Sequence, residues 1–451
     1  MAALAAEVDG DVLLPWDEDY AAERAGFNRV AQHQPALIVA AAGAADVRAA
    51  VTFAADYGLP VAVQATGHGI AAPTLGGVLI STRRMDHVTV DPVARTARVA
   101  AGARWEQVIT AAAAHGLAPL NGSSPLVGVV GYTLGGGMGL LARKYGYAAD
   151  HVTRIAVVTA DGRLLSVTEK HLPELFWGLL GGKGNFGVVT AMEFELVPVT
   201  RLYGGGLYYD GADAAEVLHA WRRWAADVPE ELVTSIALLR LPDLPQVPEF
   251  LRARLMVHVR VAHLGSAEEG EELLRPMRAA APVVLDEVGE MPYTSVADIH
   301  RDPVDPMPYN ERCITLRELD EAAVDRLLAV AGPGADADDL MVELRLLGGA
   351  LGRPSPVPNA VGNRDAAFTL ATLAPGPTRV LDALAEWGTG GRYLNFLSGP
   401  DTADEEWVRA CWPPETHARL TALKRAYDPQ NLFRANHNIL PTPDRGIRHD
   451  H

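Results

Sequence analysis

The chain has 451 residues, of which 39 are Lys or Arg and 56 are Asp or Glu, giving a formal net charge of −17. This acidic balance excludes the basic stripe of a nucleic-acid-binding protein and argues against docking on anionic membranes. Hydrophobic residues make up 49% of the chain and charged residues 21%, so we expect a globular protein with a large core. The two cysteines, Cys313 and Cys411, exclude a disulfide framework and a cysteine-based zinc module.

The N-terminal segment has no basic region and turns acidic early, so we expect no secretory signal. We also expect no transmembrane helix, because charges and glycines interrupt every apolar stretch before it reaches about 18 residues. These features predict a cytoplasmic protein.

Residues 35–116 are typical of alternating strands and helices. Strands at 35–41 and 61–64 flank a helix over 44–57, which Gly58 and Pro60 end. Further strands are expected at 78–82, 87–90 and 96–101, followed by a helix over 104–115.

The sequence pattern changes after residue 116. Residues 121–146 are crowded with glycine, a hairpin is expected around Asp161-Gly162, and residues 187–199 are typical of one long strand. Residues 201–399 alternate strand-like runs with alanine-rich helices, apart from a loop at 353–363. Residues 400–440 are expected to be helical before the final turn, and the tail at 445–451 to be solvated.

The segment Thr66-Gly67-His68-Gly69 directly follows a predicted strand. Glycine lets backbone N–H groups turn toward an anion, and an imidazole can act as a ligand, a base or a nucleophile. A histidine satisfied within its own loop explains the same pattern, so this segment alone leaves both interpretations open.

Two glycine-rich loops fit neither common nucleotide motif. In 135–139 the third glycine of G-x-G-x-x-G is missing because Leu140 holds its place, and 178–183 is one residue too short for a P-loop. The loops indicate either a different extended cofactor or turns at helix–strand junctions. The chain also lacks H-E-x-x-H, a carboxylate-rich calcium loop and G-x-S-x-G, so we predict no metal site and no serine hydrolase.

Seven segments match one family in its order and span nearly the whole chain. They are VAVQATGH (61–68), GGVLISTRRM (76–85), VGVVGYTLGGGMGLLARKYG (127–146), ELFWGLLGGKGNFGVVTAMEFEL (174–196), ELRLLGGALGRP (343–354), GRYLNFL (391–397) and YDPQNLFRANHNI (427–439). Together they resemble the berberine-bridge-enzyme-like FAD-linked oxidases of the vanillyl-alcohol oxidase superfamily, whose FAD-binding domain is called PCMH-type.

The resemblance implies an α+β fold. A two-lobed FAD-binding domain is joined to a substrate domain with a large antiparallel sheet backed by helices. The expected boundaries are 1–200 for the FAD-binding domain, 201–399 for the substrate-binding domain, and 400–451 for a C-terminal return to the FAD-binding domain.

The resemblance also implies how FAD is held. His68 aligns with the histidine that bonds covalently to the flavin 8α-methyl group, which retains the cofactor and raises its potential. Asn436 and Asn438 resemble a C-terminal amide pair that returns to the flavin. The expected cofactor-binding residues are Ala65, Thr66, Gly67, His68, Gly69, Ser124, Val127, Gly128, Gly131, Gly135, Gly139, Val188, Val189, Asn436 and Asn438.

Several positions depart from the family pattern, and two of them concern the cofactor. Ser124 stands where many relatives carry a second tether, a cysteine bonded to flavin C6. Serine is not a credible nucleophile for that bond, so we predict a single covalent attachment through His68. Gln64 replaces the arginine that is usual a few residues before the histidine.

On the substrate side, Tyr393-Leu394-Asn395-Phe396 resembles a family segment whose tyrosine acts as general base or orients the substrate. A tyrosine of pKa about 10 needs a cation or the flavin environment to act as a base, and a packing tyrosine is the alternative. Strand periodicity places His258 with Arg260, and Glu343 with Arg345, on a shared face. That polar face lines the substrate pocket together with Asn395, or it is solvated.

The implied activity is FAD-dependent oxidation. A substrate C–H bond of an alcohol, a sugar hydroxyl or an amine, in a small natural product of secondary metabolism, would donate hydride to flavin N5. O2 is the expected acceptor, giving H2O2. The alternatives are a flavin-dependent cyclase or rearranging enzyme without net H2O2 release, and a flavin-binding protein without turnover. The expected partners are a small substrate and O2, with no nucleic acid and no membrane.

Overall fold

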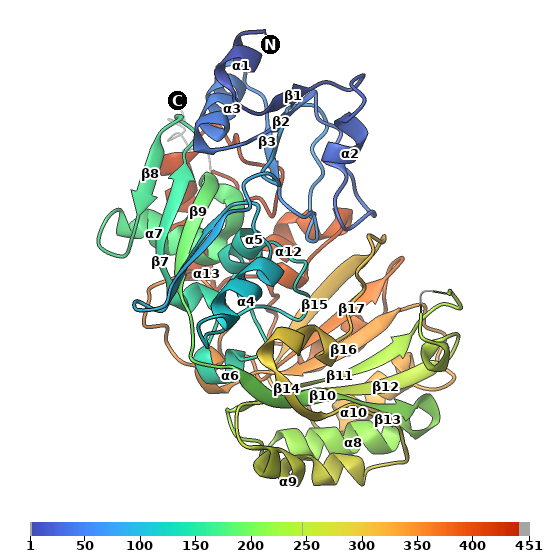
Figure 1. The fold of residues 1–451 in the computed structure, drawn as a ribbon. Coiled ribbons are helices and arrows are strands. Elements are labelled where there is room, and N and C mark those ends of the chain that lie inside the picture. The colour runs from blue at the N-terminus through green and yellow to red at the C-terminus, as the bar shows by residue number, and fades with distance from the viewer. Residues whose placement is uncertain (1, 246, 442–451) are drawn as a thin grey trace, which may run out of the picture.

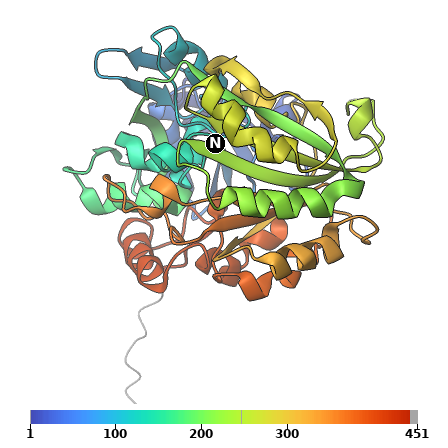
Figure 2. The same ribbon diagram turned by 90° about the horizontal axis from the view of Figure 1, so that it is seen from below.

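The computed structural model describes residues 2–245 and 247–441, which form three β-sheets with helices packed against them (Figures 1 and 2). This arrangement confirms the predicted α+β class. The tail predicted to be solvated, 445–451, lies outside the described residues. Within the described part of the chain, no helix combines the length and the apolar character that crossing a membrane requires.

The first sheet has the strand order β1-β2-β4-β3, and β4 runs parallel to both β2 and β3. Helix α3 connects β2 to β3 and buries Val47 and Val51 in a shared core with β2 and β4. The helix ends before Gly58, whose φ of 63° suits glycine. The predicted strand–helix–strand unit is therefore confirmed, with β4 lying between its two strands. The elements are α1 (Ala2–Glu7), β1 (Asp11–Leu13), α2 (Tyr20–Arg24), β2 (Leu37–Ala40), α3 (Ala44–Asp56), β3 (Val61–Gln64) and β4 (Val78–Ser81).

The second sheet is antiparallel, with the order β5-β6-β9-β7-β8. The predicted hairpin is β7–β8, whereas the strand predicted at 187–199 ends earlier, at Glu195. Helix α13 follows far later in the chain and packs on α7. The elements are β5 (Val88–Asp91), β6 (Thr96–Ala100), α4 (Trp105–Ala113), α5 (Val129–Leu134), α6 (Ala142–Tyr145), β7 (Val152–Val158), β8 (Leu164–Val167), α7 (Pro173–Gly182), β9 (Val188–Glu195), α12 (Glu405–Arg409) and α13 (Pro414–Tyr427).

The third sheet is the largest and is also antiparallel, with the order β13-β10-β12-β11-β16-β17-β15 and with β14 paired to β10. Figure 1 shows α8, α9 and α10 on the face of this sheet that is turned away from the other two sheets. All its strands lie within 201–399, and the three domain boundaries stay a prediction. The elements are β10 (Arg201–Asp210), α8 (Ala214–Ala225), β11 (Leu232–Arg240), β12 (Leu255–His263), α9 (Ala267–Arg278), β13 (Val283–Asp286), β14 (Gly289–Pro292), β15 (Asn310–Leu316), α10 (Glu321–Ala331), β16 (Met341–Leu346), β17 (Phe368–Ala374) and α11 (Val380–Ala383).

Alternation along β12 gives the large sheet two different faces. Val257, Val259 and Val261 enter the core that α8 and α9 cover. His258 and Arg260 point to the other face, where they are 1% and 3% exposed. The alternative that this polar face is solvated is therefore wrong, because the first two sheets cover this side. The result is a buried polar surface facing the rest of the molecule.

Candidate cofactor and substrate site

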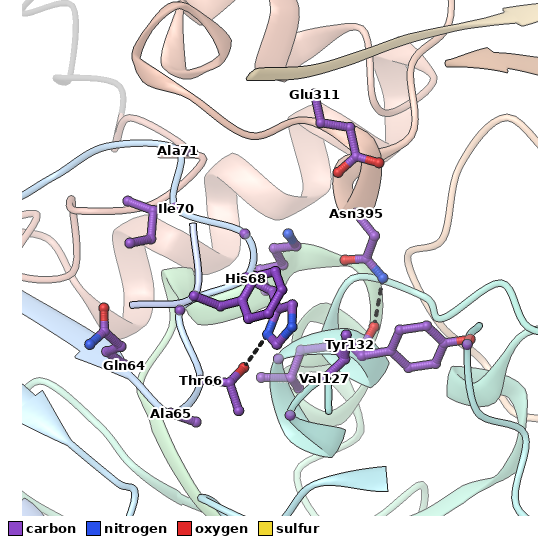
Figure 3. A pocket seen from close by; sticks show the side chains of 18 of the residues that line it. Gln64, Ala65, Thr66, His68, Ile70, Ala71, Val127, Tyr132, Glu311 and Asn395 are labelled. Carbon is purple, nitrogen blue, oxygen red and sulfur yellow. Dashed lines mark hydrogen bonds between the residues drawn. The ribbon is translucent and has the colours of Figure 1, made fainter. Parts of the chain in front are cut away.

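A cavity of about 420 Å³ lies where segments of all three sheets converge. Its walls come from the loop after β3, the segment 122–134, the start of β9, the polar face of the large sheet and the C-terminal segment 433–437. Figure 3 shows the side chains of several of these segments pointing toward one another.

The loop 65–69 is fixed by bonds to its main-chain oxygens. Phe27 N–H donates to Thr66 O at 2.9 Å, and the Tyr309 hydroxyl donates to His68 O at 2.8 Å. Gly67 has a φ of 69°, and a Cβ there would lie 2.4 Å from Gly26 Cα. Only glycine fits this turn, so local geometry sets the direction in which His68 leaves the loop.

His68 is held in one orientation in the cavity wall. Its ring stacks on Phe27 with centroids 4.0 Å apart, and Nδ1 lies 2.8 Å from Thr66 Oγ1. Nε2 is buried and has no partner within the described residues. Burial, and next to it the charge of Arg104, lower the pKa of His68 to about 4, so the imidazole is neutral at physiological pH. When Nδ1–H donates to Thr66, Nε2 carries the free lone pair.

Most of the predicted cofactor-binding residues line this cavity. Those on its wall are Ala65, Thr66, Gly67, His68, Gly69, Ser124, Val127, Gly128, Gly131, Val188, Val189 and Asn436. A Cβ at Gly69 or Gly131 would meet no atom within 4 Å, so the absent side chains leave open space on the cavity wall.

Gly135, Gly139 and Asn438 lie outside the lining. A Cβ at Gly135 would lie 2.0 Å from Asn395 Oδ1, and one at Gly139 would lie 2.1 Å from Asn121 O. The chain needs these two glycines for its own close packing, and their role in binding the cofactor stays a prediction. Asn438 has a buried Oδ1 without a partner among the described residues.

On the large sheet, Glu343 bridges two buried arginines. Its Oε1 accepts from Arg260 Nη1 at 2.6 Å and its Oε2 accepts from Arg345 Nη2 at 2.8 Å. Burial would raise the pKa of Glu343, but Arg345 and Arg260 outweigh it and hold the pKa well below its usual range. These three residues and Asn395 line the cavity. His258 does not; its Nδ1 accepts from Arg260 Nε at 3.1 Å and positions that guanidinium.

Tyr393, the predicted general base, also lines the cavity. Burial raises its pKa well above 10, and neighbouring Tyr147 adds to the effect. The Tyr393 hydroxyl lies beside the main chain of Gly136. This surrounding does not favour a tyrosinate, so a catalytic role for Tyr393 stays a prediction.

Sequence reasoning missed several ionisable groups on the cavity wall, among them Lys183 and Glu311. Burial lowers the pKa of Lys183 to about 8, and its Nζ donates to Leu394 O at 3.2 Å. Lys183 is one of only four lysines in the chain and lies in a glycine-rich loop. These two features could have marked it as a candidate site residue. Glu311 lies on β15 and carried no comparable signal, because its neighbours in the cavity come from distant segments.

Comparisons with known proteins agree with this site. Residues 35–168 match the family described as "FAD binding domain", and residues 392–440 match "Berberine and berberine like". The (R)-6-hydroxynicotine oxidase of Paenarthrobacter nicotinovorans is 30% identical over 96% of this chain and 97% of its own. The chitooligosaccharide oxidase of Gibberella zeae is 25% identical over 94% of this chain and 90% of its own. The crystal structure of 6-hydroxy-D-nicotine oxidase from Arthrobacter nicotinovorans superposes with a TM-score of 0.82 at 27% identity, covering 96% of this chain and 98% of that one.

The fold and the site define an FAD-dependent oxidoreductase. The chain belongs to the berberine-bridge-enzyme-like family of FAD-linked oxidases, within the PCMH-type superfamily. The resemblance inferred from its seven segments is thereby confirmed.

The cavity suits FAD on two observations. Gly69 and Gly131 leave open space along its wall. Buried polar atoms on the lining lack partners within the described residues, as a site built for a polar cofactor would have: Gln64 Oε1, His68 Nε2, Tyr132 hydroxyl and Asn436 Oδ1.

Proposed function

We propose that the protein oxidises a small alcohol, sugar hydroxyl or amine with FAD tethered through His68, and that O2 is the electron acceptor. FAD, when bound, would supply the acceptor for a hydride from a substrate C–H bond, with O2 as the final acceptor of the electron pair, giving H2O2. One observation carries the proposal. One cavity holds a neutral histidine, whose Nε2 has no partner within the described residues, on one wall and the Arg260–Glu343–Arg345 cluster on another.

Different residues of the chain would bind the cofactor and the substrate. The loop 65–69, Gly131 and Asn436 would bind the cofactor, and Ser124 on the wall would leave it with the single bond through His68. Tyr393 and Asn395 would orient the substrate, and the cluster on the large sheet would hold its polar groups. The relatives' names point to amines and sugars as substrates, which are two of the three classes proposed here.

The test is anaerobic reduction of the purified holoprotein. (R)-6-hydroxynicotine, N,N′-diacetylchitobiose and benzyl alcohol represent the amine, sugar and alcohol classes. We expect one class to bleach the flavin absorbance, and air to restore it with one H2O2 per product. Product without H2O2 would instead favour the cyclase or rearranging alternative. A flavin that no compound of the three classes bleaches would favour the flavin-binding protein without turnover.

A further inference from the structure

Glu311 is a rigidly placed carboxylate in the cavity. Its main chain is fixed on both sides, by pairing with Leu373 of β17 and by a pair of 2.9 Å hydrogen bonds with Ser398. Glu311 lines the cavity, and Figure 3 shows its carboxylate directed toward Asn395. Within the described residues, no hydrogen bond or ion pair uses its carboxylate oxygens.

The charges that face Glu311 come from three other segments. Arg345 and Glu343 belong to β16, Lys183 follows α7, and Asp302 lies in the loop before β15. Burial is the largest influence and raises the pKa of Glu311 to about 8; Glu343 and Asp302 raise it further, while Arg345 and Lys183 lower it. A carboxyl group of this pKa can both accept and release a proton near neutral pH.

Two other polar groups of the lining, Glu343 and Tyr393, suit that task less well. Both oxygens of Glu343 are bound to arginines, and the Tyr393 hydroxyl faces the main chain of Gly136. A free carboxylate on a fixed strand, open to the cavity, is the geometry that general-base catalysis needs.

We propose that Glu311 is the catalytic base, and that its carboxylate takes a proton from the hydroxyl or ammonium group next to the C–H bond that is oxidised. This inference rests on the proposed function. The carbon gives up its hydride to the two-electron acceptor, a carbonyl or iminium double bond forms, and the remaining proton moves to a Glu311 oxygen. The electron pair leaves with the hydride, so Glu311 itself is neither oxidised nor reduced, and it returns its proton when O2 is converted to H2O2.

The kinetic test measures flavin bleaching in a stopped-flow instrument, with the compound of the three classes that reduces the wild type. Because only ionised Glu311 can accept the proton, we expect the wild-type rate to rise about ten-fold from pH 7 to pH 9. Glu311→Gln should lower the rate at least about 100-fold and abolish this rise, with flavin content unchanged. Glu311→Asp should keep the rise with a reduced rate. An unchanged pH profile in Glu311→Gln would overturn the proposal.

A second readout needs no substrate. Folded Glu311 keeps a proton that the unfolded chain releases near its ordinary pKa, so its burial lowers stability progressively as the pH rises from about 5 to about 8. The melting temperature of Glu311→Gln should therefore exceed that of the wild type at pH 9 but match it at pH 5. Equal differences in melting temperature at both pH values would overturn the proposal, and this readout applies even if no compound reduces the wild type. A wild type that no compound reduces counts against the proposed function instead.

Asp339→Asn is the matched control. Asp339 is buried, and burial raises its pKa as it raises that of Glu311, but Asp339 lies outside the cavity lining. This variant should show a similar dependence of melting temperature on pH and the wild-type profile of flavin bleaching. A loss of bleaching in Asp339→Asn equal to that in Glu311→Gln would mean that burial of a carboxylate, and not its place in the cavity, causes the effect, which would overturn the proposal.

Discussion

Asp428→Ala should lower the free energy of unfolding by about 3–5 kcal/mol. Asp428 follows α13 and pairs with Lys424 at 2.7 Å, and both side chains are 0% exposed. Lys424 Nζ also donates to the main-chain oxygens of Asn185 and Phe433, and the Asp428 carboxylate accepts from Leu432 N–H and Phe433 N–H. Without the carboxylate, a buried ammonium loses its counter-charge and two buried N–H groups lose their acceptor.

The chain offers a matched control in Glu405→Ala. Glu405 pairs with Arg409 at the same i,i+4 spacing and the same 2.7 Å, but these side chains are 61% and 60% exposed. Water screens the exposed pair, so we expect a change below about 0.5 kcal/mol. Urea unfolding measures both variants, and similar losses in the two would contradict the argument from burial. Asp428→Ala should also lose flavin, because the segment it anchors carries Asn436 to the cavity.

Glu343→Gln should have an effect of similar size, about 3–5 kcal/mol. The substitution keeps the shape but leaves Arg260 and Arg345, both buried, without their shared counter-charge. Because the pKa of Glu343 is held low, its contribution to stability is fully present above the ordinary glutamate pKa. It is lost progressively as the pH falls from that value through the lowered one.

Glu174→Gln is the control for this cluster. Glu174 accepts two hydrogen bonds from Arg419, at 2.6 and 3.0 Å, on the protein surface. We expect its loss to change the free energy of unfolding by less than about 1 kcal/mol. Adding Arg345→Met to Glu343→Gln should recover part of the lost stability, since fewer buried charges then lack a partner. No recovery in the double variant would mean that the charge is not the cause.

Local patterns in the sequence predicted much of the fold. The helix at 44–57 is visible because Val47 and Val51 recur at helical spacing and Gly58 ends it. The alternation of valines with His258 and Arg260 on β12 predicted two different strand faces. It could not tell which face is solvated, because that depends on whether the other two sheets cover it.

The site was predictable where its residues are close in sequence. The loop 65–69 directly follows β3, so its histidine could be placed at a strand end from sequence alone. Glu311 could not be found this way, because its backbone is fixed by Ser398, and Arg345 and Lys183 approach it only in the folded chain. Sequence alone also cannot tell a glycine that leaves room for a ligand from one, such as Gly139, that packs against the chain's own backbone.

The central claim, FAD held in this cavity and tethered through His68, is tested most directly by the flavin absorbance of purified protein before and after acid precipitation. We expect the flavin of the wild type to stay with the precipitated protein, and that of His68→Ala to be released into the supernatant. Flavin released from both proteins would contradict the tether, and wild-type protein without any flavin absorbance would contradict the assignment of the cavity to FAD.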